Sequence, residues 1–262
     1  MTTEPLDLRT APASGSEVLE LRGVTRRFGD GDAAVEAVRS VDLSVAAGEI
    51  VLIMGPSGSG KTTLLTMIGG LLRPSAGRVL LGGADITGTP THGRARAGLA
   101  RTFQRLELFG VLTAHANVRV AADLAHRRGH HQGRSADEVA EALLARVGLT
   151  DVADVRADQL PTGQARLVEV ARALAAAPKV LLLDEPASGL DEGETSALGA
   201  LLRELAADGI AIVLVEHDVP LVLSTCDRVH VLDVGRVLAV GSPDEIRNDQ
   251  RVHDAYLGAV TA

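Results

Sequence analysis

The sequence predicts an α/β protein with a mostly parallel central sheet that helices cover on both faces. Three short segments, residues 49–55, 179–185 and 210–217, contain continuous apolar runs of the kind found in strands buried on both faces. A helix is predicted after each of these segments, so strands and helices alternate along the chain. This alternation indicates parallel strands joined by helical crossovers.

Two half-buried strands are predicted ahead of the first buried one. Apolar and polar residues alternate over residues 18–24 and again over residues 38–45, and GDGDAA between them is a turn or loop. Residues 1–16 are polar and acidic and are predicted to be a disordered tail. The remainder, residues 17–262, is predicted to be a single domain.

The middle of the chain changes from strand-like to helical spacing. After the first buried strand a helix is predicted whose apolar face extends to Leu71, and residues 77–83 indicate another strand. Helical spacing then dominates, and residues 105–165 are predicted to be a helical subdomain inserted between core segments 17–104 and 166–262. SADEVAEALLARVG in this stretch opens with a capping box, which marks a helix start.

The last third returns to alternating strands and helices. A helix through Ala177 leads to the strand at residues 179–185, and a helix around residues 194–207 leads to the next strand. A short helix then precedes the strand RVHVLD, which turns at Val234 and Gly235 into RVLAVG. These elements complete the predicted sheet.

Composition excludes several kinds of protein. The chain of 262 residues is 46% hydrophobic but only 2% aromatic, so Ala, Val and Leu must build its core. With a formal net charge of -8 and no basic block, it is not expected to bind nucleic acid. Cys226, the only cysteine, is predicted to be a small buried side chain. The apolar runs are far shorter than the roughly 20 residues of a membrane helix, so the chain is expected to lie against a membrane at most.

GPSGSGKT matches the phosphate-loop pattern GxxxxGK[ST]. It follows a buried strand and opens a helix, which is the context that this chemistry requires. Glycines let backbone N–H groups curl around a β-phosphate, Lys61 reaches the β- and γ-phosphate oxygens, and the Thr62 hydroxyl ligates Mg²⁺. The predicted nucleotide contacts are Gly55, Pro56, Ser57, Gly58, Ser59, Gly60, Lys61, Thr62 and Thr63.

Two carboxylates, Asp184 and Glu185, end the apolar strand VLLLDE. The carboxyl ends of parallel strands form the sheet edge at which ligands bind. Asp184 is predicted to hold Mg²⁺, and Glu185 to polarise the attacking water as general base. Lys61 joins Glu185 as a predicted catalytic residue. An ordinary loop start with two acids is the alternative.

His217 and Gln104 are two further candidates. His217 ends the strand that follows Glu185, so it lies on the same sheet edge and is placed to contact the γ-phosphate. A structural histidine is the alternative. Gln104, in RTFQ, is a neutral amide suited to touch Mg²⁺ or the attacking water, and it stands just before the helical insertion. Gln104 alone identifies no function.

The segment LPTGQARLVEVARAL predicts a helix whose N-terminus binds an anion. Gly163 is predicted to break the chain just before the helical stretch, and a proline and a threonine stand in front of it, where a helix start is expected. Unpaired N–H groups at such an N-terminus favour a negative charge. The apolar positions with helical spacing are Leu167, Val170, Ala171 and Leu174.

These motifs, in this order, resemble the ATPase subunit of an ABC transporter over nearly the whole chain, from about residue 18 to residue 258. The resemblance implies a P-loop NTPase (RecA-like) core with a parallel sheet, a small antiparallel β subdomain and an inserted α-helical subdomain. It implies that the chain hydrolyses ATP with Mg²⁺. Gln104 matches the Q-loop, residues 160–164 the signature motif, residues 188–191 the D-loop, and His217 the switch histidine. Phe28, in TRRFG, matches the aromatic residue that stacks on adenine.

The resemblance also implies a second ABC ATPase subunit, identical or a close sibling. In this family two subunits face each other, and each signature helix points its N-terminus at the γ-phosphate held by the other subunit. An ATP shared in this way pulls the chains together, and hydrolysis lets them separate. The nucleotide contacts implied on this side are Thr162, Gly163, Gln164 and Asp191.

The signature differs from the usual LSGGQ. Pro161 replaces the serine and Thr162 the first glycine. The hydroxyl that contacts the γ-phosphate is therefore missing, unless Thr162 supplies one from the adjacent position. Gly163 and Gln164 keep the backbone donors, so activity is expected to survive. An inactive signature loop is the alternative.

Several segments are similar to the branched-chain amino-acid importer group of ATPases, which includes urea and amide importers. They are ARAGLARTFQRLELFGVLTAHANV, DEPASGL, VEHDVPLVLSTCDRVHVLDVGRVLAVGSPDEIRND and AYLG. The N-terminal third, VEAVRSVDLSVAAGEIVLIMGPSGSGKTTLL, is more similar to ATPases of lipoprotein-release and macrolide-export systems. The longer part predicts an amino-acid or amide importer, with an exporter as the alternative.

The resemblance implies integral-membrane permease subunits as partners, and a cytoplasmic chain that is peripheral on the inner face of the cell membrane. Leu106, Leu108 and Phe109 are expected to receive a short permease helix, although core packing explains them equally well. A soluble ABC ATPase of iron–sulfur cluster assembly is a second possible function. A regulatory module that holds ATP without turnover is a third, and the intact Lys61, Glu185 and His217 argue against it. Because the ATPase does not touch the cargo, the sequence identifies neither cargo nor direction.

Overall fold

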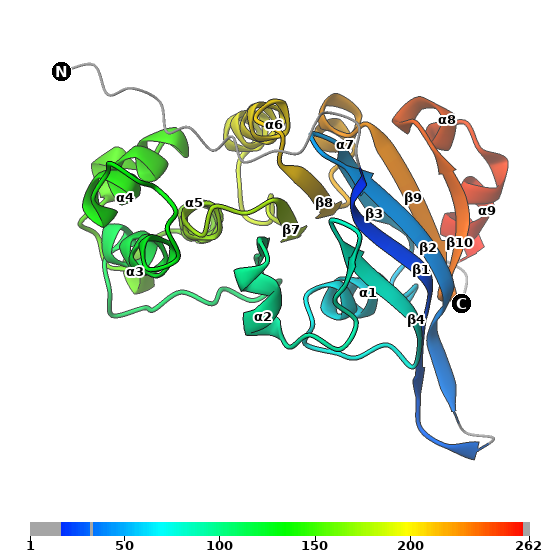
Figure 1. Cartoon of the computed structure of the whole chain (residues 1–262). Helices are drawn as coiled ribbons and strands as arrows, with labels where there is room; N and C mark the ends of the chain where they lie inside the picture. The colour runs from blue at the N-terminus through cyan, green and yellow to red at the C-terminus, as the bar shows by residue number, and fades with distance from the viewer. Residues whose placement is uncertain (1–16, 32–33, 259–262) are drawn as a thin grey trace.

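The computed structural model describes residues 17–31 and 34–258 (Figure 1). The tail predicted at residues 1–16 lies outside the described residues. The first half contains β1 (Glu17–Phe28), β2 (Val35–Ala46), β3 (Ile50–Met54), α1 (Lys61–Ile68), β4 (Ala76–Leu81), β5 (Ala84–Asp85), α2 (Thr91–Arg96), β6 (Leu99–Arg101), α3 (Ala114–His126) and α4 (Ala136–Arg146). The second half contains the 3₁₀ turns η2 (Thr150–Val152) and η3 (Ala157–Gln159), then α5 (Thr162–Ala175), β7 (Val180–Asp184), α6 (Glu192–Ala207), β8 (Ala211–Val215), α7 (Val219–Thr225), β9 (Arg228–Asp233), β10 (Arg236–Gly241), α8 (Pro243–Arg247) and α9 (Gln250–Gly258).

The larger sheet confirms the predicted α/β class. Its strand order is β10-β9-β3-β8-β7-β6. The neighbours from β9 to β6 pair in parallel, and β10 pairs antiparallel to β9. The strands β3, β7 and β8 are the three apolar runs of the sequence, and each is followed by a helix. Their carboxyl ends therefore lie at one sheet edge.

Alternate residues of these strands belong to two different cores. Ile50 and Leu52 of β3 pack in a cluster with α5 and α6, whereas Val51 and Ile53 pack in a cluster with α1 and the smaller sheet. Successive side chains of a strand point to opposite faces of the sheet, and both faces of this sheet are covered. The continuous apolar runs follow from it, because both faces must be apolar.

The smaller sheet, with strand order β2-β1-β4-β5, is antiparallel and lies against α1 (Figure 1). The strands β1 and β2 form a long hairpin, and Val24 and Val38 lie on its fully buried face. This sheet is the small antiparallel β layer that the family resemblance implies.

The helices α3 and α4 pack against α5, at the opposite end of the molecule from the tip of the β1–β2 hairpin (Figure 1). The capping box at Ser135 and Glu138 starts α4, as predicted. Cys226 is buried, also as predicted. Among the described residues, the helices are too short or too polar to cross a bilayer.

Three predicted helix boundaries are wrong. The first helix ends at Ile68 rather than continuing through Leu71, because Gly70 turns the chain at a φ of 78° and leaves Leu71 54% exposed. The helix predicted through Ala177 ends at Ala175. Gly163 is the second residue of α5 rather than a break in front of it.

Residues 105–112 are not helical, although helical spacing was predicted from residue 105. The helix α3 starts at Ala114, where the Thr113 side chain accepts a hydrogen bond from the N–H of Ala116. The preceding loop is held by the buried Asn117, whose Oδ1 accepts from the N–H of Phe109 at 2.9 Å. A side chain thus supplies the backbone bonds that a helix would have made.

Candidate functional site

Four loops meet at the carboxyl edge of the larger sheet. They follow β3, β6, β7 and β8, and they carry Lys61, Gln104, Glu185 and His217 respectively. The register places the end of β7 beside the end of β8, with Asp184 opposite Val215. The fold therefore brings the predicted catalytic loops to one edge of the sheet.

The phosphate loop requires glycine at two positions. Gly55 has a φ of 147° and Gly60 a φ of 104°, which are strained for other residues. A Cβ atom would collide with the carbonyl of Leu232 at Gly55 and with the carbonyl of Ala37 at Gly60. The loop is thus packed against the rest of the fold, with Ser59 buried at its centre.

The helix α1 presents an N-terminus that no side chain caps. Gly60 is its N-cap residue, in a left-handed conformation and without a side-chain hydrogen bond. The side chain of Thr62, the second residue of α1, is exposed. A helix start of this kind, behind a glycine-rich loop, suits a phosphate group.

Lys61 is held at this helix start by the loop itself. Its Nζ donates to the carbonyls of Gly55 at 2.7 Å and Pro56 at 2.9 Å. Burial lowers the pKa of Lys61, and the charges of Glu185 and Asp184 oppose that effect. The ammonium group and both carboxylates therefore share one electrostatic environment.

Asp184 is buried at the end of β7, beside a cation that the sequence analysis did not identify. The Arg101 guanidinium lies 3.5 Å from its Oδ2, and both side chains are at most 9% exposed. Burial raises the pKa of Asp184, and Arg101 opposes that rise. The sequence does show a charged residue, Arg101, at the end of the three-residue strand β6. Its contact with Asp184 could not be predicted without knowing that β6 pairs with β7.

Glu185 adopts a backbone conformation that is rare for a residue with a side chain. Its φ is 49°, and its N–H donates to the carbonyl of Val215 at 2.9 Å. Residues held in the left-handed region cluster at functional sites. The side chain is half-buried, so it reaches solvent next to the buried Asp184.

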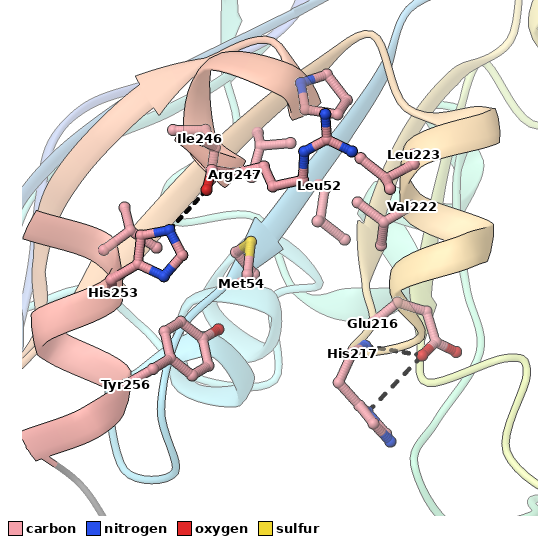
Figure 2. Close-up of a pocket in the computed structure, with 13 residues that line it drawn as sticks. Leu52, Met54, Glu216, His217, Val222, Leu223, Ile246, Arg247, His253 and Tyr256 are labelled. Carbon is pink, nitrogen blue, oxygen red and sulfur yellow. Dashed lines mark hydrogen bonds and ion pairs between the residues drawn. The ribbon is translucent and has the colours of Figure 1, made fainter. Parts of the chain in front are cut away.

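His217 projects from the end of β8 into solvent, with its side chain 79% exposed. Its Nδ1 lies 3.8 Å from the carboxylate of Glu216, a contact drawn in Figure 2. Glu216 itself is buried, at 4% exposure. His217 was predicted from its place at the end of the strand, whereas Glu216, the residue before it, was not.

A cavity of about 250 Å³ lies between α7 and the C-terminal helices α8 and α9 (Figure 2). Met54, which precedes the phosphate loop, lines it together with His217 and Tyr256. Burial raises the pKa of the Tyr256 hydroxyl, and its hydrogen bond with the Gly55 backbone opposes that rise. Tyr256 thus links the last described helix to the phosphate loop, a contact that the sequence pattern does not reveal.

Gln104 is exposed, and its backbone is tied to α5. Arg166 on α5 donates to the carbonyl of Phe103 at 2.5 Å and to that of Gln104. Glu169, one turn further, accepts from the N–H of Glu107 at 2.6 Å. Two buried charged residues of α5 therefore hold the loop that carries Gln104.

The start of α5 is uncapped and faces the loop before α6. Pro161 is its N-cap residue and provides no side-chain bond, and Thr162 is exposed. Gly163 is buried, and a Cβ there would lie 2.8 Å from the carbonyl of Gly189. Within this chain, the signature segment therefore contacts the predicted D-loop.

Two predicted nucleotide contacts have intrachain partners of their own. Asp191 caps α6, where its Oδ1 accepts from the N–H of Glu194 at 2.8 Å. Phe28 ends β1 and is 41% exposed, and the Arg26 guanidinium lies 4.6 Å from its ring centroid. Gln164, the third residue of α5, is half-buried.

Fold and site together define a phosphate-loop nucleotide-binding protein. A family model described as "ABC transporter" matches residues 38–188, more than half of the chain. A second model, described as "Branched-chain amino acid ATP-binding cassette transporter", matches residues 236–262. The chain therefore belongs to the ABC transporter family, as its ATP-binding and ATP-hydrolysing subunit.

Relatives support this assignment over most of the chain. The high-affinity branched-chain amino acid transport ATP-binding protein BraF of Pseudomonas aeruginosa is 39% identical over 92% of this chain and 98% of its own length. The lipopolysaccharide export system ATP-binding protein LptB of Acidithiobacillus ferridurans is 40% identical over 84% of this chain and 90% of its own length. A dimeric ATP-binding cassette solved in a post-hydrolysis state with ADP and Pi is 31% identical, with a TM-score of 0.78, over 86% of this chain and 98% of its own.

Proposed function

We propose that this subunit powers an amino-acid importer, by hydrolysing ATP against a second cassette and driving separate permease subunits. The common sheet edge carries the catalytic part of the proposal. There the Lys61 ammonium lies close enough to Asp184 and Glu185 for both charges to act on its pKa. ATP bound at residues 55–63 would place its phosphates between this ammonium and the two acids.

Each residue at the edge has a role in the proposed reaction. The N–H groups of the phosphate loop and Lys61 bind the β- and γ-phosphates. Glu185 orients and polarises the attacking water, and the exposed His217 contacts the γ-phosphate. Phe28 stacks on adenine, for which its exposed ring is suited.

The residues present fit a divalent cation beside the phosphates. The exposed hydroxyl of Thr62, the amide of Gln104 and the carboxylate of Asp184 are oxygen ligands of the kind that Mg²⁺ prefers. Mg²⁺ held there would neutralise charge on the β- and γ-phosphates. Arg101, which pairs with Asp184, keeps that buried carboxylate compensated by a positive charge.

The start of α5 serves the ATP of the opposite subunit in this proposal. Thr162, Gly163 and Gln164 direct N–H groups, and Thr162 a hydroxyl, at the γ-phosphate held by the other phosphate loop. The absence of a side-chain cap on α5 supports this role. Asp191 keeps one carboxylate oxygen for its helix cap and presents the other across the interface.

The importer direction rests on two resemblances. The chain matches BraF over nearly its whole length, and its C-terminal residues match a family model described for branched-chain amino acid transporters. The similarity to LptB favours export as a second candidate. In either direction, the subunit lies on the inner face of the cell membrane, bound to its permeases.

Three measurements test the proposed function. The purified chain is expected to release phosphate from ATP only with Mg²⁺, and Glu185→Gln is expected to lose that activity. Tagged chain, purified from detergent-solubilised membranes of its own cell, is expected to carry integral-membrane permease subunits. Cells from which the gene for the chain is deleted are expected to lose uptake of radiolabelled branched-chain amino acids. Copurification with a soluble scaffold instead would support the iron–sulfur alternative and contradict the transport proposal.

A further inference from the structure

Glu216 connects the loop of Glu185 to the loop of His217. It is the first residue after β8, and it is buried although it lies at the sheet edge that carries the site. Its Oε1 accepts from the N–H of Ala187 at 2.8 Å. Its Oε2 accepts from the N–H of His217 at 2.9 Å, and from that of Asp218 at 3.5 Å.

The two loops held by this carboxylate are the ones that carry the proposed catalytic groups. Ala187 stands two residues after Glu185, whose own N–H is bonded to Val215 at the end of β8. His217 is mostly exposed, and Figure 2 draws contacts from its backbone N–H and from its ring to the carboxylate of Glu216. One buried carboxylate thus accepts hydrogen bonds from the loop of the proposed general base and from the loop of the proposed γ-phosphate contact.

We propose that Glu216 is a positioning residue, which sets the placement of Glu185 relative to His217 by accepting hydrogen bonds on both of its oxygens. The proposal rests on the function proposed above. A carboxylate is needed because it accepts on each side. Glutamine has one acceptor and one donor, so in either orientation its NH₂ faces the N–H of Ala187 or that of His217. Aspartate is one methylene shorter and cannot span both loops.

The test is the ATPase activity of Glu216→Gln with saturating ATP and Mg²⁺. Misplacing the base and the histidine affects the chemical step, whereas Lys61 and the phosphate loop still bind ATP. We expect kcat to fall about tenfold or more, with KM changed less than about twofold. A buried carboxylate that served only the fold would not produce this split between kcat and KM.

Glu49→Gln is the matched control. Glu49 also accepts a backbone bond, from the N–H of Ala46 at 2.8 Å, and it lies at the opposite end of β3 from the phosphate loop. Its substitution is expected to leave kcat within about twofold of the wild type. An equal loss of kcat in both variants would overturn the proposal, because it would mark a general effect on the fold.

The outcomes separate the two proposals. If the wild type has no ATPase activity that Glu185→Gln removes, the proposed function itself fails. If that activity is present and Glu216→Gln keeps the wild-type kcat, only the role of Glu216 fails. If Glu216→Gln does not fold, Glu216→Asp decides by the same split, and failure of both variants to fold would overturn the proposal in favour of a structural role.

Discussion

Lys61 and Asp184 carry opposite charges into a partly buried region of the sheet edge. Burial lowers the pKa of Lys61 and raises that of Asp184, so in both cases it favours the neutral form. In each case a neighbouring opposite charge opposes the shift. The Arg101 guanidinium takes part in this balance. Such a set is suited to bind a polyanion together with a divalent cation. The polyanion would be attracted by the Lys61 ammonium, and the cation by the Asp184 carboxylate.

Lys61→Ala is expected to weaken ATP binding about tenfold or more, because the variant loses a charged donor to the β- and γ-phosphates. It also loses the two bonds that tie Nζ to the carbonyls of Gly55 and Pro56. The dissociation constant for ATP, measured by isothermal titration calorimetry, checks this. Lys179→Ala is the control, since Lys179 precedes the amino end of β7, at the opposite end of that strand from Asp184. Equal weakening of ATP binding by both variants would contradict the assignment of Lys61.

His230 predicts a loss of stability in mild acid. Burial, with a further contribution from Arg228, lowers its pKa from 6.5 to about 4 in the folded chain. Between these values the unfolded chain binds a proton that the folded chain does not, so stability falls as the pH drops below about 6.5 and the loss is complete near 4. From about pH 7 to about pH 5 this amounts to about 2 kcal/mol.

Urea unfolding of the wild type and of His230→Leu, each at both pH values, measures this difference. The leucine variant lacks the titrating ring, so its unfolding free energy is expected to fall by about 2 kcal/mol less than that of the wild type. Parallel losses in the two proteins would show that His230 does not contribute.

At the scale of elements, α5 and the loop of Gln104 behave as one unit. Arg166 bonds to the carbonyls of Phe103 and Gln104, and Glu169 pairs with Arg166 at 3.2 Å while accepting from the N–H of Glu107. A movement of the Gln104 loop therefore has to carry α5 with it. This connects the residue proposed to bind Mg²⁺ to the helix proposed to serve the opposite subunit.

Glu169→Gln is expected to destabilise the chain by about 2 kcal/mol or more, because the buried Arg166 loses its carboxylate partner. Burial raises the pKa of Glu169, and the hydrogen bond from the Glu107 backbone and the charges of Arg166 and Arg172 oppose that rise. The urea midpoint is the measurement. Glu141→Gln on the exposed face of α4 is the control, and a Glu169 variant as stable as that control would contradict the coupling.

Elements with a strong local pattern were predicted from the sequence. The strands β3, β7 and β8 are apolar on both faces, and the capping box of Ser135 and Glu138 marks the start of α4. Elements that depend on distant partners were not. The strand β6 is three residues long and exists through its pairing with β7, and residues 105–112 have helical spacing but are held by Asn117 and α5.

The same distinction applies to the site. Motif residues such as Lys61 and Glu185 could be proposed from the sequence, because the pattern that points to their chemistry is contiguous. The residues missed, Arg101, Glu216 and Tyr256, act on partners that are far apart in sequence or on backbone groups. Such pairs become visible only when the register of the sheet and the packing of the C-terminal helices are known.

At the scale of the whole molecule, the proposal divides the nucleotide site into two halves that lie apart on this chain. The phosphate loop with its acids lies at the carboxyl edge of the sheet, and the uncapped start of α5 lies against residues 189–190. The post-hydrolysis relative with ADP and Pi is a dimer. A pair of chains would complete two sites from the two halves.

The most direct test of this arrangement is the molar mass of Glu185→Gln, measured by light scattering on a size-exclusion column with ATP and Mg²⁺. The variant is expected to bind ATP without hydrolysing it, so the shared phosphates should hold two chains together and give the mass of a dimer. A monomeric mass with ATP bound would contradict the account, because the start of α5 would then have no phosphate to contact.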